Sequence, residues 1–120
     1  MPSLTAIRLI AYRRQGGRCL YCNLPIWLDD PDAFRTRYPL IAKQLALRRC
    51  TAEHLVARQD GGNNAPGNIA AACWLCNWLR HRRPQARSPD EHRKHVRARL
   101  RRGAWLPRAM VEAFRSTQVP

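Results

Sequence analysis

The sequence predicts a small α+β domain that is stapled by a metal ion and extended by helices at both ends. Two observations predict this class. Four of the five cysteines form two Cys-x-x-Cys pairs, and between them two short strand-like segments flank a loop rich in glycine and asparagine. At 120 residues the chain suits one domain with a modest core, which a structural metal would supplement. We expect an N-terminal helix over 1–17, a core over 18–84 with a helical insert near 28–48, and a basic helical extension over 85–120.

The first helix is indicated by apolar residues that recur at helical spacing between positions 4 and 11. Ser3 or Thr5 is a suitable N-cap, and the glycine pair at 16–17 would end the helix. In the insert, prolines at 31 and 39 favour the starts of two short helices.

The centre of the core has the pattern of two strands and a helix. "RRCTAEHLV" is short and contains β-branched residues, so we expect a strand that ends near His54. The Gly/Asn run that follows is a loop, and "NIAAA" predicts the second strand. A helix should begin at the second cysteine pair and end at Pro84.

The C-terminal extension has a strong helix start at Ser88-Pro89-Asp90-Glu91, with a cap, a proline and acids in the first turn. Gly103 should end this helix, and Pro107 should open a last short one. We interpret everything after Pro84 as an addition to the metal-bearing centre.

The charge of the chain is strongly positive. Lys and Arg total 22 against 8 acidic residues, a formal net charge of +14, and only Lys43 and Lys94 are lysines. Guanidinium groups bind phosphate bidentately, so nucleic acid is the first candidate partner. A membrane surface is the rival, but the sequence has no apolar run of about 20 residues that could span a bilayer. Without a recognisable secretory signal, we expect a cytoplasmic protein.

The cysteine pairs indicate a structural zinc site. A two-residue gap lets both thiolates of a pair bind one tetrahedral ion. A redox dithiol or four buried thiols would also use these residues, but two such pairs in a reducing compartment favour metal. The expected ligands are Cys19, Cys22, Cys73 and Cys76. Cys50 is left over, and we expect it to be a buried apolar residue near a strand start.

The order of motifs resembles an HNH endonuclease. A Cys-x-x-Cys pair is followed by Glu53-His54, a Gly-Gly loop and Asn68, and the second pair runs directly into Asn77. The resemblance covers Arg18 to about Arg83. It implies a ββα-metal fold and a metal-dependent endonuclease that hydrolyses DNA phosphodiester bonds, most simply in double-stranded DNA, to 5′-phosphate and 3′-hydroxyl ends.

The same resemblance assigns roles within the site. His54 would be the general base, and a neutral imidazole has a suitable pKa for accepting a proton from water. Glu53 and Asn77 would hold a divalent ion, and their oxygens favour Mg²⁺ or Mn²⁺. Many family members carry Asp and His at these two positions, so the metal preference is open. Asn68 would brace the loop and orient the base, although it also suits an ordinary turn.

Two further expectations concern the geometry of this site. His81 lies four residues after Asn77 on one helix side, where it would complete the metal site or contact phosphate. Asn77 could equally be a surface residue of that helix. Adjacent strand residues point to opposite faces, so Glu53 and His54 need a twisted strand end or a bulge to serve one site.

Positive side chains continue from the second cysteine pair into the C-terminal extension. Contacts between positive side chains and phosphates position an enzyme on nucleic acid without distinguishing its base sequence. The expected phosphate-binding residues are Arg80, Arg82, Arg83, Arg93, Lys94, Arg97, Arg101 and Arg102. For Trp74, Trp78 and Trp105 we expect packing in the core or around the cysteines, ahead of base stacking.

Two other functions use the same residues. One is a non-catalytic, zinc-stabilised nucleic-acid-binding module, and the other is an RNA-directed nuclease, because charge alone does not separate RNA from DNA. The Glu-His pair together with Asn77 favours catalysis. A single site cuts one strand, so breaking both strands at once would need a second copy of the chain, as in a homodimer.

Overall fold

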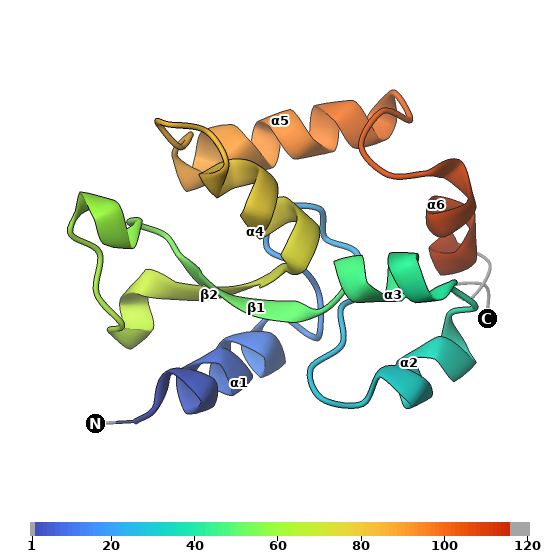
Figure 1. The fold of residues 1–120 in the computed structure, drawn as a ribbon, viewed down its shortest axis with the longest axis horizontal. Helices are drawn as coiled ribbons and strands as arrows, with labels where there is room; N and C mark the ends of the chain where they lie inside the picture. The colour runs from blue at the N-terminus through green and yellow to red at the C-terminus, as the bar shows by residue number, and fades with distance from the viewer. Residues whose placement is uncertain (1, 116–120) are drawn as a thin grey trace.

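The computed structural model describes residues 2–115 and confirms a small α+β fold (Figure 1). The described residues form six α-helices and one two-stranded sheet. In chain order the elements are α1 (Leu4–Arg14), α2 (Pro31–Arg37), α3 (Ala42–Leu47), β1 (Cys50–His54), β2 (Ile69–Cys73), α4 (Trp74–His81), α5 (Pro89–Arg101) and α6 (Arg108–Arg115), with 3₁₀ turns at Arg58–Asp60 and Pro66–Asn68 between the strands.

The centre is a β-hairpin followed directly by a helix. The strands β1 and β2 pair antiparallel from Cys50↔Cys73 to His54↔Ile69. This register is continuous through Glu53 and His54. Of the two expected geometries, a bulge or a twisted strand end, the bulge is therefore wrong, and His54 is the last residue of the strand. All five residues of β2 are buried, because α1 covers one side of the hairpin and α4 the other (Figure 1).

Local sequence signals set the ends of the helices as expected. Ser3 caps α1 by accepting a hydrogen bond from the Ala6 N–H. Ser88 and Glu91 form a reciprocal capping box at the start of α5. Gly17 has a φ of +72° and delivers the chain into the first cysteine pair, where a side chain at this position would be strained.

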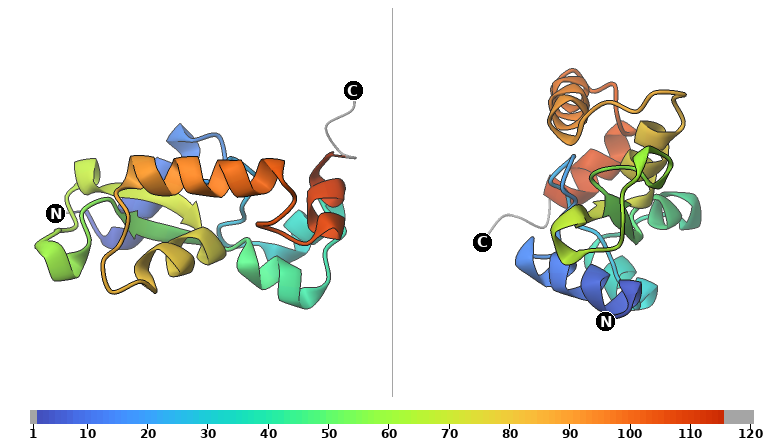
Figure 2. Two further views of the ribbon diagram at one scale, coloured as in Figure 1. Left: turned by 90° about the horizontal axis from the view of Figure 1, so that it is seen from above. Right: turned by 90° about the vertical axis from the view of Figure 1, so that its left-hand side faces the viewer.

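The C-terminal extension packs into the molecule rather than lying beside it. Val96 of α5 is fully buried in the main core, and the ring of Trp105 packs against the same cluster. A second apolar cluster joins the insert to the last helix through Tyr38, Leu40, Leu106, Met110 and Phe114. Figure 2 shows the resulting layers, with α5 and α1 on opposite sides of the hairpin.

Candidate metal centre and active-site cleft

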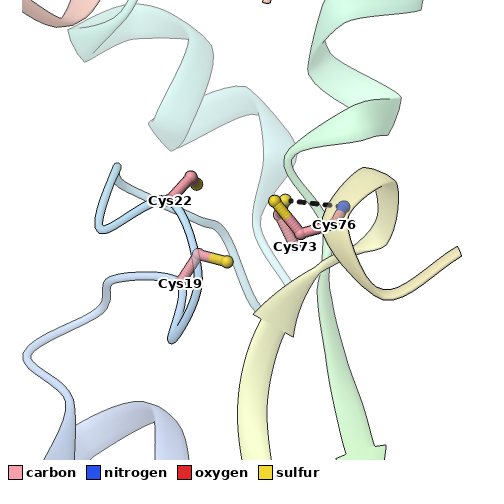
Figure 3. A group of neighbouring side chains, drawn as sticks. All are labelled: Cys19, Cys22, Cys73 and Cys76. Atoms are coloured by element: carbon pink, nitrogen blue, oxygen red, sulfur yellow. Dashed lines mark hydrogen bonds between the residues drawn. The ribbon is translucent and has the colours of Figure 1, made fainter. Parts of the chain in front are cut away.

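The four cysteines of the two Cys-x-x-Cys pairs form one buried group, the four-cysteine cluster. The Sγ atoms of Cys19, Cys22, Cys73 and Cys76 all lie within 4.8 Å of one another (Figure 3). The first pair comes from the turn after α1, and the second from the end of β2 and the first turn of α4. Four thiolates in a closed, buried group are the donor set of a structural zinc site, so these residues fit zinc.

Each sulfur of the cluster also accepts one N–H hydrogen bond. The Tyr21 backbone N–H donates to Cys19 Sγ at 3.3 Å, and Arg48 Nη2 donates to Cys22 Sγ at 3.4 Å. The Cys76 backbone N–H donates to Cys73 Sγ at 3.3 Å, and Trp105 Nε1 donates to Cys76 Sγ at 3.4 Å. Donors around a thiolate stabilise its charged form and orient it toward a metal. The indole donor lies in the C-terminal extension, so that segment completes the surroundings of the cluster.

Arg48 is a buried cation beside the cluster. Its Nε and Nη2 atoms donate to the Pro25 carbonyl at 3.0 and 2.8 Å, and its side chain is fully buried. Burial lowers the pKa of Arg48, but the nearby cysteine thiolates outweigh that effect and raise it overall. Four thiolates and one Zn²⁺ carry a net charge of about −2, and Arg48 offsets part of it inside the protein. No local pattern in the sequence indicates this residue.

The surroundings act unequally on the pKa values of the cysteine thiols. Burial raises the pKa of Cys19 well above its usual value. Hydrogen bonds from the other three cysteines and the Arg48 charge lower the pKa of Cys22 despite its burial. Cys50 is fully buried at the start of β1, as expected, and burial raises the pKa of its thiol to about 11. Cys50 lies outside the cluster.

A cleft of about 270 Å³ opens at the end of β1, against α4. It brings together four residues singled out in the sequence, from two elements, together with part of the loop. Its lining residues are Ala52, Glu53, His54, Ala57, Arg58, Gln59, Asn77 and His81. Glu53 and His54 reach one cleft without a bulge because His54 is the last strand residue and the cleft wraps around the strand end.

Glu53 is a fully buried carboxylate with partners on both oxygens. Oε1 lies 2.7 Å from His81 Nε2. Oε2 accepts a hydrogen bond from the Tyr21 hydroxyl at 2.9 Å and lies 3.4 Å from Arg80 Nη1. Burial and the Glu53 charge raise the pKa of Tyr21, so its hydroxyl remains a neutral donor. These contacts fix the orientation of the carboxylate.

His54 is half-buried and is held by the loop. Its Nε2 lies 2.8 Å from Asn64 Oδ1 and 3.3 Å from Arg58 Nε. The shorter contact suits a tautomer in which Nε2–H donates to the Asn64 oxygen. In that tautomer Nδ1 carries the free lone pair that a general base requires.

The two asparagines of the predicted motif have different surroundings. Asn77 Nδ2 donates to Thr51 Oγ1 at 2.9 Å, which leaves its amide oxygen without a hydrogen-bond partner among the described residues. Asn68 bridges the loop: Oδ1 accepts from the Val56 N–H at 2.8 Å, and Nδ2 donates to the carbonyls of Val56 and Asn63. Asn68 therefore braces the loop and does not line the cleft.

The loop after His54 is tightly closed. A Cβ on Gly62 would stand 1.7 Å from the Val56 carbonyl oxygen, so only glycine fits there. This approach brings residues 56–64 back over the strand end, where Asn64 meets His54.

Arg80 was expected on the positive surface, and that expectation is wrong. Its guanidinium is buried and donates to the carbonyls of Arg87, His54 and Leu55 at 2.8–2.9 Å. It therefore ties α4 to the strand end and to the following segment from a buried position.

The other expected phosphate-binding residues differ in solvent exposure and in whether the side chain already has a partner within the protein. Arg97 is exposed but donates to the Tyr21 carbonyl at 3.1 Å, and Arg93 pairs with Asp90. The remaining five, Arg82, Arg83, Lys94, Arg101 and Arg102, are exposed.

Three arginines that the sequence analysis missed lie near the cleft. Arg8, Arg49 and Arg58 line a neighbouring hollow that also includes His54. Arg58 lies four residues after His54, a proximity that could have suggested it. Nothing local indicated Arg8, because α1 reaches the hairpin only through packing.

The expectation for the tryptophans is correct for one of three. Trp105 is half-buried against the cluster. Trp74 and Trp78 are exposed on α4, so the prediction that they pack in the core or around the cysteines is wrong for these two.

Comparison with known proteins gives one match. Residues 40–83 match the family model described as HNH endonuclease. The matched segment includes both strands, the loop, α4 and all the cleft residues, together with the second cysteine pair. The search of curated proteins and the search of solved structures each gave no match. Separately, none of the helices in the described part of the chain is both long and apolar enough to cross a membrane.

Proposed function

We propose that the protein is a metal-dependent endonuclease and that it hydrolyses DNA phosphodiester bonds. The premise is the match of residues 40–83 to the HNH endonuclease family model. One observation carries the proposal: a single cleft gathers Glu53, His54, Asn77 and His81 from β1 and α4. A carboxylate, an amide oxygen and two imidazoles together supply a general base and ligands for a divalent ion.

The proposed base is His54 Nδ1. Asn64 holds the opposite ring nitrogen at 2.8 Å, so the imidazole keeps one tautomer and one orientation. His54 would take the proton of the attacking water as the water approaches phosphorus. Arg58, 3.3 Å from His54 Nε2, adds a positive charge beside the phosphate position.

The proposed metal ligands are Glu53, Asn77 and His81. Oε1 of Glu53 and Nε2 of His81 are already 2.7 Å apart, close to the separation of two adjacent ligand atoms on one ion. The free amide oxygen of Asn77 lines the same cleft. A bound Mg²⁺ or Mn²⁺ would offset charge on the phosphate and on the departing oxygen.

The proposed substrate is DNA, with the duplex as the simplest form. A net charge of +14 and the arginines that flank the cleft support a polyanion. The five buried free cysteines suit a reducing compartment such as the cytoplasm.

The test is conversion of supercoiled plasmid to nicked or linear DNA. The zinc-loaded protein is compared with His54→Ala, in Mg²⁺, in Mn²⁺ and without added divalent ion. His95→Ala is the matched control, because His95 lies on α5 and does not line the cleft. We expect metal-dependent cleavage that falls by about 10²- to 10⁴-fold in His54→Ala, with DNA binding retained in both variants.

Two results would contradict the proposal. Binding without cleavage in either metal would favour the non-catalytic binding module. Equal cleavage by His54→Ala and wild type would mean that another group acts as the base or that the activity is a contaminant. An RNA of the same sequence, tested in parallel, decides between the two nucleic acids.

A further inference from the structure

Helix α4 presents two stacked tryptophans to solvent. The rings of Trp74 and Trp78 are nearly parallel, with centroids 5.5 Å apart and an interplanar angle of 10°. Their exposed fractions are 39% and 45%. Arg82 lies one turn further on, with its guanidinium carbon 5.1 Å from the centre of the Trp78 ring. We call these three side chains the Trp–Arg stack. Large aromatic surfaces are usually buried, so this exposure calls for an explanation.

The stack lies beside the cleft. A second hollow, of about 320 Å³, is lined by Thr51, Trp74, Asn77, Trp78, His81 and Arg82. Asn77 and His81 line both this hollow and the cleft, so the two are adjacent on the surface. A strand with its phosphate at His54 and Glu53 would therefore pass next to the tryptophan rings.

We propose that the Trp–Arg stack binds an unpaired nucleobase of the substrate strand, next to the phosphate that is cut. This inference rests on the proposed function and deepens it. An indole face offers a base a flat apolar surface, and stacking of this kind tolerates any base. Arg82 extends the stack with a cation that also suits the neighbouring phosphate.

The geometry selects an unpaired base over a duplex. In a duplex the faces of each base are covered by its neighbours, so a ring can stack on a base only at a strand end, in a single strand or on a base turned out of the helix. The enzyme should therefore favour substrates with unpaired nucleotides beside the cut.

Another copy of this chain is a poorer occupant of the stack. Two rings offer far less than the roughly 800 Å² per partner of a stable interface. The net charge of +14 and the arginine within the stack would also repel a like-charged copy.

The test is binding of fluorescently labelled oligonucleotides to the full, zinc-loaded chain without Mg²⁺ or Mn²⁺. We use three probes of about 12 nucleotides, a length of roughly one binding site. They are a single strand of thymidines, the same backbone with abasic sites throughout, and a duplex. Trp74→Ala is compared with Trp74→Tyr, which keeps a flat ring. Ile41→Ala is the control, because Ile41 is 59% exposed and lies outside both hollows.

We expect Trp74→Ala to weaken binding of the single strand by about 5- to 150-fold, the range for loss of one stacked base. The abasic strand should change by less than about twofold, since it offers no base to stack. The duplex should change much less than the single strand, because only its two end pairs expose a base face. Trp74→Tyr should bind much like wild type, and Ile41→Ala should be unchanged. Zinc content and melting temperature, measured on every variant, show that the fold is retained.

Three outcomes would overturn the proposal. Equal weakening for the abasic and the thymidine strands would mean that Trp74 acts through the backbone or the fold. No change for any probe would mean that the rings bind no base. Loss of self-association in Trp74→Ala, without loss of DNA binding, would assign the stack to a protein contact. Because the assay needs no cleavage, these outcomes remain separate from failure of the plasmid test.

Discussion

The four-cysteine cluster and the cleft lie at opposite ends of the same hairpin, and they are built in opposite ways. The cluster contains four identical soft donors, all buried, and each sulfur has one N–H partner. The cleft mixes oxygen and nitrogen donors and is open to solvent, and no described residue hydrogen-bonds to the amide oxygen of Asn77. A closed, saturated site suits a structural ion, and an open site suits chemistry.

The comparison also indicates a direction of dependence. Cys73 and Cys76 fix the first turn of α4, and Asn77 and His81 follow on the next turns of the same helix. The cluster therefore positions the cleft, whereas Tyr21 and Arg80 orient the Glu53 carboxylate of the cleft through protein contacts alone. Loss of zinc should damage both sites, whereas loss of the ion proposed for the cleft should damage only the cleft.

The largest expected effect is that of removing zinc. Cys73→Ser, or a strong chelator, should unfold the centre, because zinc binding supplies on the order of 10 kcal/mol of folding free energy in small zinc domains. Circular dichroism would measure the loss of folded structure, and zinc analysis would measure the loss of bound metal. Cys50→Ala is the matched control, a buried cysteine outside the cluster that should keep both zinc and fold. A folded, zinc-free Cys73→Ser protein would refute the structural role of the cluster.

The second effect tests the buried charge beside the cluster. Arg48→Met removes the cation that donates to Cys22 and to Pro25, so the negative cluster loses this buried positive charge. We expect a loss of about 3–5 kcal/mol in unfolding free energy, measured by urea denaturation of the zinc-loaded protein. Arg49→Met, at an adjacent and exposed arginine, should cost less than about 0.5 kcal/mol. Equal losses would show that the charge at position 48 has no special role.

Local patterns predicted most of the framework. The cysteine pairs, the capping box at Ser88 and the turn-rich loop each depend on residues close in sequence, so hydrogen-bond and metal geometry within a few positions determined them. The grouping of Glu53, His54 and Asn77 came from the resemblance to a family, because a strand and a helix about 20 residues apart meet only through the tertiary fold.

Burial was the part that local patterns predicted poorly. Arg80 lies four residues after the buried Cys76, so helical periodicity placed it on the inward side of α4, yet its charge suggested the surface. The stacked tryptophans were expected inside because of their apolar character. Tyr21 and Arg48 act across more than 20 residues of sequence, and no local signal identifies such partners.

The third effect concerns the cleft alone. Tyr21→Phe removes the hydroxyl that donates to Glu53 Oε2 at 2.9 Å but keeps the ring. Loss of such an outer partner typically weakens metal binding or activity about 10- to 100-fold, so cleavage should need correspondingly more Mg²⁺ or Mn²⁺. Zinc content should not change. A metal titration of plasmid cleavage measures this, with Tyr12→Phe as the control, and an unchanged titration would mean that Glu53 does not hold the ion.

The smallest effect compares a hydrogen bond to a cysteine sulfur of the cluster with a hydrogen bond to a backbone carbonyl elsewhere. Trp105→Phe removes the N–H that donates to Cys76 Sγ at 3.4 Å, and Trp27→Phe removes one that donates to the Leu45 carbonyl at 2.8 Å. Each should cost about 1 kcal/mol of stability. Only Trp105→Phe should also lower zinc affinity, by about fivefold for a free energy of that size, in competition with a chelator. Both variants replace an indole with a smaller phenyl ring and so lose packing as well as an N–H. Zinc affinity, compared between the two, is therefore the measurement that reports what one N–H contributes to a thiolate. Equal zinc affinity in the two variants would show that the C-terminal extension supports the cluster by packing alone.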